Sequence, residues 1–238
     1  LLTAIGAGAA SAPDLRVDLI EIHPATGNPR LVVFEMEGSV VKGGISGAMP
    51  APDSFSVYGS MFGIRNFDQE LRMTGTATDR LGFRHTPYRQ FFRRLPVLGG
   101  ILRLHEEPGG PIRSINGLFV PDIDIDSRPA VPSVRAQATA FNIVADAISV
   151  FDIPWLESKP PTLMILRTNL ARGKPGRDHL VWEVEVGDGR AVREILYIDA
   201  HHGKVIDRVS GIHSIDRQIH QRLFGTTGWI ESDPFPYN

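Results

Sequence analysis

Cysteine is absent from this chain of 238 residues, which excludes a disulfide framework and any metal site built from thiolates. An excess of charge is missing too, because 25 Lys and Arg stand against 27 Asp and Glu, for a net charge of −2. This balance gives no electrostatic basis for binding nucleic acid or an anionic membrane. Hydrophobic residues make up 42% and charged residues 22% of the chain, which are ordinary values for a folded protein with a real core.

Catalytic motifs are also missing. The zinc peptidase motif H-E-x-x-H places two imidazoles one helical turn apart, with the Glu as general base. The only His-Glu dipeptide, His105-Glu106, continues with Glu107-Pro108 and lacks the second His, and Pro108 would break a helix. Neither a serine nucleophile elbow nor a phosphate-binding glycine loop occurs in the sequence. We therefore predict no catalytic, metal-binding or cofactor-binding residues in this chain.

Two groups of side chains offer weaker candidates for a metal site. His201 and His202 are adjacent, so they would point to opposite faces of a strand, and we expect them to be solvated turn residues. Asp122, Asp124 and Asp126 alternate in a way that suggests calcium ligands. An EF-hand loop requires Gly at its sixth and Glu at its twelfth position, however, and both positions hold Ser here. A solvated strand end is the favoured interpretation, and calcium is the weaker alternative.

The first twelve residues, LLTAIGAGAASA, form a short run of small and apolar residues that ends in Ala10-Ser11-Ala12. This A-x-A arrangement is typical of a signal-peptidase site, and the run is too short to span a bilayer. We expect residues 1–12 to be the remnant of a signal peptide on a protein that is secreted, by bacterial export, and that has no membrane span. A disordered Ala/Gly terminus is the alternative.

Residues 81–122 contain three strand-like runs, Phe83 to Phe92, Val97 to His105 and Ile112 to Pro121, which Leu95-Pro96 and Pro108 to Pro111 separate. Turn residues between alternating apolar runs predict an antiparallel meander, and we expect its arginines to lie on a solvated edge. Further elements are expected upstream: a strand over Leu31 to Val40, a short helix over Ser54 to Phe62 with Asp53 as N-cap, and a strand over Glu70 to Thr78.

The second half repeats this order after a proline-punctuated link at residues 127–133. Apolar residues spaced by three and four predict a helix over Val134 to Val150. Strands are predicted over Leu163 to Thr168, His179 to Val186, Val192 to Asp199 and Val205 to Val209. The predicted fold is therefore α+β, with two small domains in tandem over residues 14–126 and 134–210. Each would be a helix packed on a curved antiparallel sheet, in a cystatin-like arrangement.

Sequence motifs in both halves of the chain resemble those of a known family. The stretch FRHTPYRQFFRRLPVLGGILRLH, followed by INGLFVPD, resembles the fungalysin/thermolysin propeptide domain. The stretch YIDAHHGKVI is similar to the end of a PepSY domain, whose turn Asp199, Gly203 and Lys204 would form. Asp199 can accept hydrogen bonds from backbone amides in that turn, and Gly203 permits a positive φ. Residues 211–238 resemble the start of the peptidase domain, truncated here, with a turn at Phe224 to Gly228.

The resemblance implies the pro-region of an exported thermolysin-like zinc metalloendopeptidase. Such a region acts in cis on its cognate peptidase domain, as an intramolecular chaperone and as an inhibitor until it is cleaved. Zinc, with calcium as a second candidate, would then belong to the peptidase domain. The predicted inhibitory and cleavage segment is Arg208, Val209, Ser210, Gly211, Ile212, His213 and Ser214, with Val209 or Ile212 in an apolar pocket of the enzyme. The alternatives are a free-standing secreted peptidase inhibitor and an envelope binding protein with PepSY-type domains.

Overall fold

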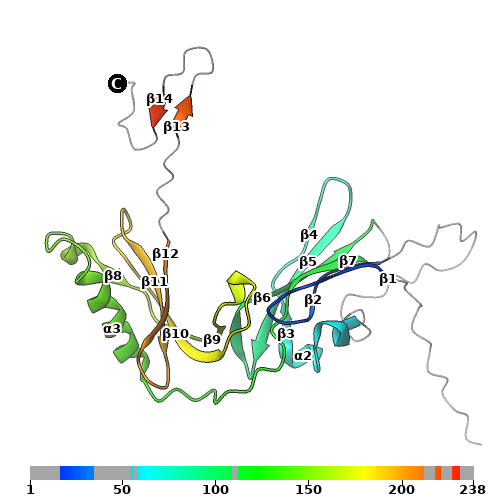
Figure 1. Ribbon diagram of the computed structural model, residues 1–238, viewed down its shortest axis with the longest axis horizontal. Coiled ribbons are helices and arrows are strands. Elements are labelled where there is room, and N and C mark those ends of the chain that lie inside the picture. The colour runs from blue at the N-terminus through cyan, green and yellow to red at the C-terminus, as the bar shows by residue number, and fades with distance from the viewer. Residues whose placement is uncertain are drawn as a thin grey trace, which may run out of the picture.

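The computed structural model describes residues 17–34, 55, 58–108, 112–211, 218–220 and 227–230. A sheet of 12 strands dominates these residues, and its main path has the order β1-β2-β7-β6-β9-β10-β11-β12. β5 lies beside β6, while the short strands β3, β4 and β8 pair at the margins. Figure 1 shows the sheet bent into a U, with β1 to β7 in one arm, β10 to β12 in the other, and the junction of β6 with β9 at its base.

The N-terminal arm is built from strands that alternate between a buried and an exposed face. Leu102 and Leu104 of β6 are fully buried, whereas Arg103 between them is exposed, as expected for a strand with one covered face. The cover consists of short helical turns, from which Phe55 and Phe62 pack on the sheet. The elements of this arm are β1 (Val17–Ile22), β2 (Pro29–Phe34), η1 (Gly59–Phe62), α2 (Phe67–Glu70), β3 (Leu71–Met73), β4 (Ala77–Thr78), β5 (Arg84–Phe92), β6 (Leu95–Glu106) and β7 (Ile112–Leu118).

The C-terminal arm carries the long helix α3 (Ser133–Ala145) on its outer side. Ala136, Ala140 and Val144 recur every four residues and form the buried stripe of this helix. These small side chains pack against Val184 and Leu196 of the sheet. The other elements of this arm are η2 (Ile153–Trp155), β8 (Glu157–Ser158), β9 (Thr162–Arg167), η3 (Leu170–Arg172), β10 (Asp178–Gly187), β11 (Arg193–Asp199) and β12 (Val205–Ser210).

The two arms meet where β6 and β9 pair in parallel, at Val97 and Ile165. A buried cluster that includes both residues and Leu180 covers the junction from the outer side. Gly99 has a φ of +75°, and the β5–β6 register slips at this point of β6. The extra residues of this bulge shift the alternation of side chains along β6. Leu98, before the bulge, and the alternating residues after it therefore point to the same side of the sheet, the inside of the U.

The predicted fold class is wrong. Instead of two tandem domains, each with a helix on its own antiparallel sheet, the described residues form one large mixed sheet. α3 is the one long helix in the described part of the chain, and the N-terminal arm has only a 3-10 turn and a four-residue helix at the corresponding place. The error arose because β6 and β9 are far apart in the sequence, and their pairing leaves no local pattern.

Several local predictions can also be compared with the structure. The meander β5–β6–β7 is confirmed, but Leu95-Pro96 lies within β6, and Arg93 with Arg94 forms the turn instead. The predicted helix is shorter than expected, since α3 ends at Ala145. The signal-peptide remnant at residues 1–12 and the proposed N-cap Asp53 lie outside the described residues.

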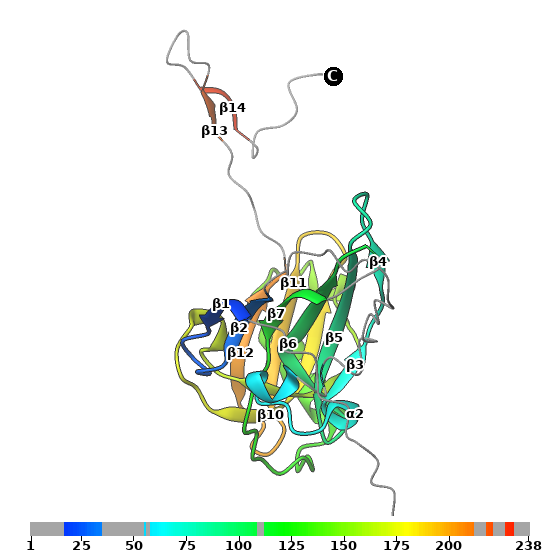
Figure 2. The same cartoon turned by 90° about the vertical axis from the view of Figure 1, so that its right-hand side faces the viewer.

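The last two strands stand apart from the main sheet. β13 (Gln218–His220) and β14 (Thr227–Ile230) pair with each other in an antiparallel manner. Figures 1 and 2 both show this hairpin away from the U. Across the residues that the structure describes, no helix has the length and apolar character needed to cross a membrane.

Candidate functional site: the inner face of the sheet

Both arms of the U carry their helical cover on the outer side and leave the opposite face of the sheet turned toward the other arm (Figure 1). We call this surface the inner face. Because side chains alternate along a strand, the pairing registers identify its members. On the C-terminal arm they include Met164, Leu166, Val181, Glu183, Tyr197 and Asp207; on the N-terminal arm they include His85, Arg89, Arg103, His105 and Asn116.

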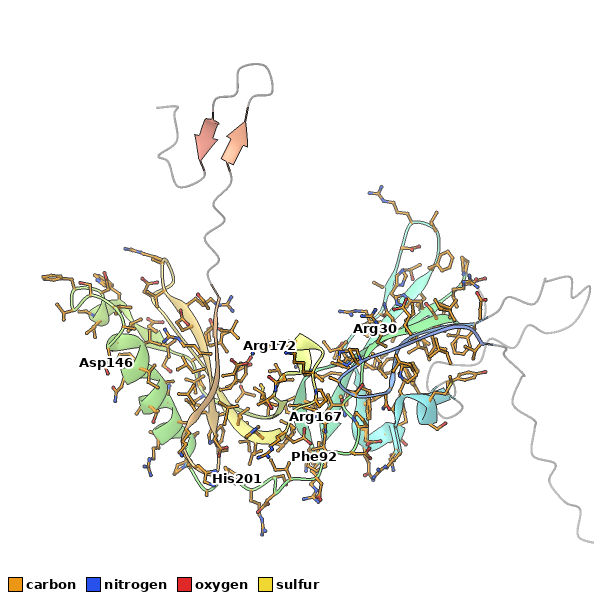
Figure 3. The ribbon with its side chains drawn as sticks, viewed as in Figure 1. Arg30, Phe92, Asp146, Arg167, Arg172 and His201 are labelled. Carbon is orange, nitrogen blue, oxygen red and sulfur yellow. The ribbon has the colours of Figure 1, made fainter. Side chains whose placement is uncertain are left out.

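A cavity of about 360 Å³ lies at the base of the inner face, where the arms join. Apolar side chains from both arms line it, among them Leu98 and Leu118 from one arm and Leu166 from the other. Arg172 of η3 also lines the cavity and points into the space between the arms in Figure 3. A volume of this size accommodates one or two bulky apolar side chains of a partner.

An acidic row crosses the C-terminal arm of the inner face. Glu183, Tyr197 and Asp207 are directly opposed on three neighbouring strands. Burial, together with the nearby carboxylate of Glu183, raises the pKa of the Tyr197 phenol, so that it stays neutral. Among the described residues, neither Glu183 nor Asp207 forms an ion pair. The row therefore offers two uncompensated carboxylates around a tyrosine ring.

The N-terminal arm offers the opposite charge. Arg89 and Arg103 are exposed on its inner face, and no ion pair of the described residues includes either one. Arg84 differs, since it binds the buried carboxylate of Glu106 through two hydrogen bonds. The arginines predicted to lie on a solvated edge therefore differ in role. Arg84 forms an internal ion pair, whereas Arg89 and Arg103 belong to a basic surface.

The predicted inhibitory and cleavage segment begins in the edge strand β12. Arg208, Val209 and Ser210 pair with Leu196, Ile195 and Glu194 of β11, and the amide of Gly211 donates to the carbonyl oxygen of Arg193 at 2.7 Å. Val209 shares the face of Asp207 and is 43% exposed. Ile212, His213 and Ser214 lie outside the described residues.

The predicted PepSY turn follows β11. The carboxylate of Asp199 accepts hydrogen bonds from the amides of His201 and His202, both at 2.8 Å, and Gly203 has a φ of +76°. The carbonyl oxygen of Lys204 accepts the Asp199 amide at 2.7 Å. Burial would raise the pKa of Asp199, but these amide hydrogen bonds and the rings of His202 and His179 hold it below its usual range. The turn has the local geometry expected of its residues, and a functional role for it remains a prediction.

The weaker metal candidates are dispersed. Asp122 pairs with Arg65, and Asp126 pairs with Arg128 at 3.2 Å. His202 bonds Asp199, whereas Nε2 of His201 is buried without a hydrogen-bond partner, so His201 is not the solvated residue that we expected. Within the described part of the chain, no three His, Cys, Asp or Glu side chains gather in a way that could hold a metal ion.

Sequence reasoning missed the residues that dominate the inner face. The acidic row and the pair Arg89 and Arg103 come from strands that were predicted, but their common face depends on register and on the β6–β9 junction. One available signal was the alternation within each strand, which already separated Glu183 from Trp182 and Arg103 from Leu104.

Comparisons with known proteins agree with the resemblance in the sequence. A family model described as the Fungalysin/Thermolysin Propeptide Motif matches residues 69–119. Thermolysins from Alicyclobacillus acidocaldarius subsp. acidocaldarius, Bacillus caldolyticus and Bacillus sp. (strain EA1) are each 30% identical to the chain over 145 residues. That match covers 59% of this chain and 25% of each relative, so the chain spans about a quarter of the length of these proteins.

A solved structure, the Bacillus megaterium YpeB C-terminal domain, aligns with a TM-score of 0.36 and 13% identity over 77% of this chain and 72% of that chain. This similarity is too weak to indicate a shared fold. The PepSY resemblance of residues 134–210 therefore remains a prediction from the sequence. Residues 69–119 thus match the propeptide motif, and the comparisons support a resemblance of the chain to the propeptide region of thermolysin-like proteins.

Proposed function

We propose that this chain is the pro-region of an exported thermolysin-like zinc metalloendopeptidase, and that it holds its own peptidase domain on the inner face until it is cleaved. The observation that carries this proposal is the route of the chain. β12 borders the inner face, and the predicted inhibitory segment begins within this strand, at Arg208. A peptidase that followed in the same chain would meet the inner face at a very high effective concentration, and cleavage would remove that advantage.

The charges of the inner face define the expected partner surface. A partner between the arms would place basic groups against Glu183 and Asp207, and acidic groups against Arg89 and Arg103. Charges of this kind steer association and fix its orientation. The cavity near Leu98 would receive an apolar side chain at the centre of the interface, where hot spots gather.

The pairing of β12 with β11 also narrows the range of peptide bonds at which we propose cleavage. A peptidase binds its substrate as an extended chain, so cutting inside Arg208 to Ser210 would first require β12 to leave β11. The bond between Gly211 and Ile212 follows the last hydrogen bond to β11 that the described residues form, and it is the scissile bond that we propose. It places the bulky apolar Ile212 after the cut, as a thermolysin-like enzyme is expected to prefer.

The chaperone role is part of the same proposal. A large peptidase with many non-local contacts folds slowly, and a preformed charged and apolar surface can hold its folding intermediates in one orientation. Export would supply the compartment in which the released enzyme acts. Zinc, with calcium as a second ion, is assigned to the peptidase domain, because H-E-x-x-H is absent from this sequence.

The test adds the purified 238-residue chain to an active thermolysin-like peptidase, measures the inhibition constant, and identifies the cut by N-terminal sequencing. We expect submicromolar inhibition and a new N-terminus at Ile212. Asp207→Lys and Arg103→Glu should each weaken inhibition about tenfold, because each reverses a charge that faces the partner.

Matched controls make the same charge changes on the outer side. The first control is Asp146→Lys, because Asp146 lies next to the end of α3, on the outside of the U in Figure 3. The second is Arg135→Glu, because Arg135 lies on α3 itself. Both should leave inhibition unchanged. The proposal fails if the wild-type chain does not inhibit at micromolar concentration and the cut falls outside residues 208–214.

A further inference from the structure

Two histidines face each other on the inner face, where neither belongs to the contacts invoked for the peptidase. His85 of β5 and His105 of β6 are directly opposed in the antiparallel register. Their rings lie 4.9 Å apart between centroids, and the two Nδ1 atoms are only 2.6 Å apart. Two ring nitrogens at this distance share either a hydrogen or a cation.

The outer nitrogens of both rings are already engaged. Nε2 of His85 lies 3.2 Å from a carboxylate oxygen of Asp79, and Nε2 of His105 lies 3.1 Å from the side-chain oxygen of Asn116. Both oxygens can accept a hydrogen bond, and in the tautomers in which each Nε2 donates to its oxygen, the lone pairs lie on the Nδ1 atoms. Each Nδ1 then presents its lone pair to the other.

Asp79 is held in place for this role. Its second carboxylate oxygen accepts hydrogen bonds from the amides of Leu81 at 2.8 Å and Phe83 at 3.0 Å. A histidine that donates its outer N–H to a carboxylate or amide oxygen is the usual arrangement behind a metal ligand.

We propose that His85 and His105 form a two-imidazole clamp for a divalent transition-metal ion such as Zn²⁺ or Cu²⁺, bound through both Nδ1 atoms. Bonds of about 2.0 Å at a tetrahedral angle would place the nitrogens about 3.3 Å apart, so the rings need to open only slightly. Since no third His, Cys, Asp or Glu joins them in the described part of the chain, water or a partner ligand completes the coordination. Imidazole favours Zn²⁺, Cu²⁺ and Ni²⁺ over Mg²⁺ or Ca²⁺.

The charged residues around the two histidines determine the expected affinity for the metal ion. Arg103 lies on the same face as the pair, two residues from His105, and opposes a bound cation, whereas Asp79 favours it. Arg84 and Glu106, which adjoin the two histidines in sequence, neutralise each other. With two protein ligands and this charge balance, we expect a dissociation constant in the micromolar range.

The experiment titrates the full, untagged chain with ZnCl₂ and with CuCl₂ by calorimetry, with MgCl₂ as the hard-ion comparison. His85→Gln and His105→Gln should each remove one equivalent of binding or weaken it at least tenfold. His202→Gln is the matched control, because that imidazole also bonds a carboxylate, while its ring lies 6.2 Å from that of His201 between centroids, farther than the 4.9 Å between His85 and His105. Circular dichroism of every variant verifies that the fold is retained.

A second readout does not depend on affinity. Electron paramagnetic resonance of the Cu²⁺ complex should show two equivalent nitrogen ligands in the wild type and one in either single variant. Metal should also raise the thermal midpoint of the wild type but not that of the double variant. The proposal is overturned if binding is absent, if it survives both substitutions, or if nuclear magnetic resonance finds only a proton shared between the rings. None of these outcomes bears on inhibition, which is tested separately.

Discussion

At the scale of single residues, turn chemistry was predictable where a residue type requires it. Asp188 and Gly189 form a hairpin turn typical of these residue types, in which the carboxylate of Asp188 accepts hydrogen bonds from three backbone amides and Gly189 has a φ of +73°. The β5–β6 turn was not predictable, because Arg93 and Arg94 adopt φ values of +47° and +72° without any glycine or asparagine. Only the pairing of the flanking strands forces two arginines into this conformation.

Arg94→Gly is therefore expected to raise the free energy of unfolding by about 1 kcal/mol, since a side chain at positive φ costs roughly that much. Equilibrium unfolding in urea measures the change. The reciprocal control is Gly99→Ala, at a φ of +75° with open space around the new methyl group. It should destabilise by a similar amount, and an unchanged or lower stability of Arg94→Gly would contradict the strain argument.

At the scale of elements, alternation and turn residues located most of the strands of both arms, but not β1, which buries no face, or the two-residue β8. The lengths and partners of these strands were harder to obtain. β10, for example, pairs with β8, β9 and β11, and its side chains also join the strands electrostatically. Glu185 of β10 bonds Arg193 of β11 at 3.0 Å and Lys159 next to β8 at 2.8 Å.

These hydrogen bonds, first those of Arg193 and then that of Lys159, lower the pKa of Glu185 from 4.5 to about 2. A carboxylate with a depressed pKa stabilises the fold above its ordinary pKa, and loses this effect as the pH falls through its value in the folded state. Glu185→Gln should thus reduce the free energy of unfolding by about 1 kcal/mol at pH 7. The difference from wild type should shrink between pH 4.5 and 2.

Urea unfolding at pH 7, 5, 3 and about 2 provides this comparison. Glu157→Gln is the control, because Glu157 is an exposed carboxylate that forms no ion pair among the described residues. Its difference from wild type should not follow the same pH course. A constant deficit of Glu185→Gln at every pH would show that the ion pairs do not stabilise the sheet.

At the scale of the whole molecule, the single sheet is the feature that local patterns could not provide. The parallel contact of Val97 with Ile165 joins strands that lie far apart in sequence, and the cluster around Leu180 covers it. The inner face, with its paired histidines and facing charges, follows from this junction. Its residues could be read from the sequence one strand at a time, but their assembly could not.

A shared sheet and a shared buried cluster predict one cooperative unfolding transition, where two independent domains would give two. All three tryptophans lie after residue 154, so their fluorescence reports on the C-terminal half. Leu104→Ala in the N-terminal arm should destabilise the protein by about 3 kcal/mol and shift the fluorescence midpoint as much as the midpoint from circular dichroism. Leu196→Ala, in the core under α3, is the matched substitution in the other arm. Separate midpoints for the two signals would show that the arms unfold independently.

The edge position of β12 has a mechanical consequence. Tension applied through the C-terminal tail reaches β12 at Ser210, which is paired with Glu194 at the start of β11. The strand would therefore be peeled from β11 one hydrogen bond after another, as a zipper opens, and would not be sheared along its whole length. Peeling stops at the turn around Gly203, where the carboxylate of Asp199 accepts hydrogen bonds from two backbone amides. A pull from the C-terminal side thus detaches β12 at low force and leaves the rest of the sheet intact.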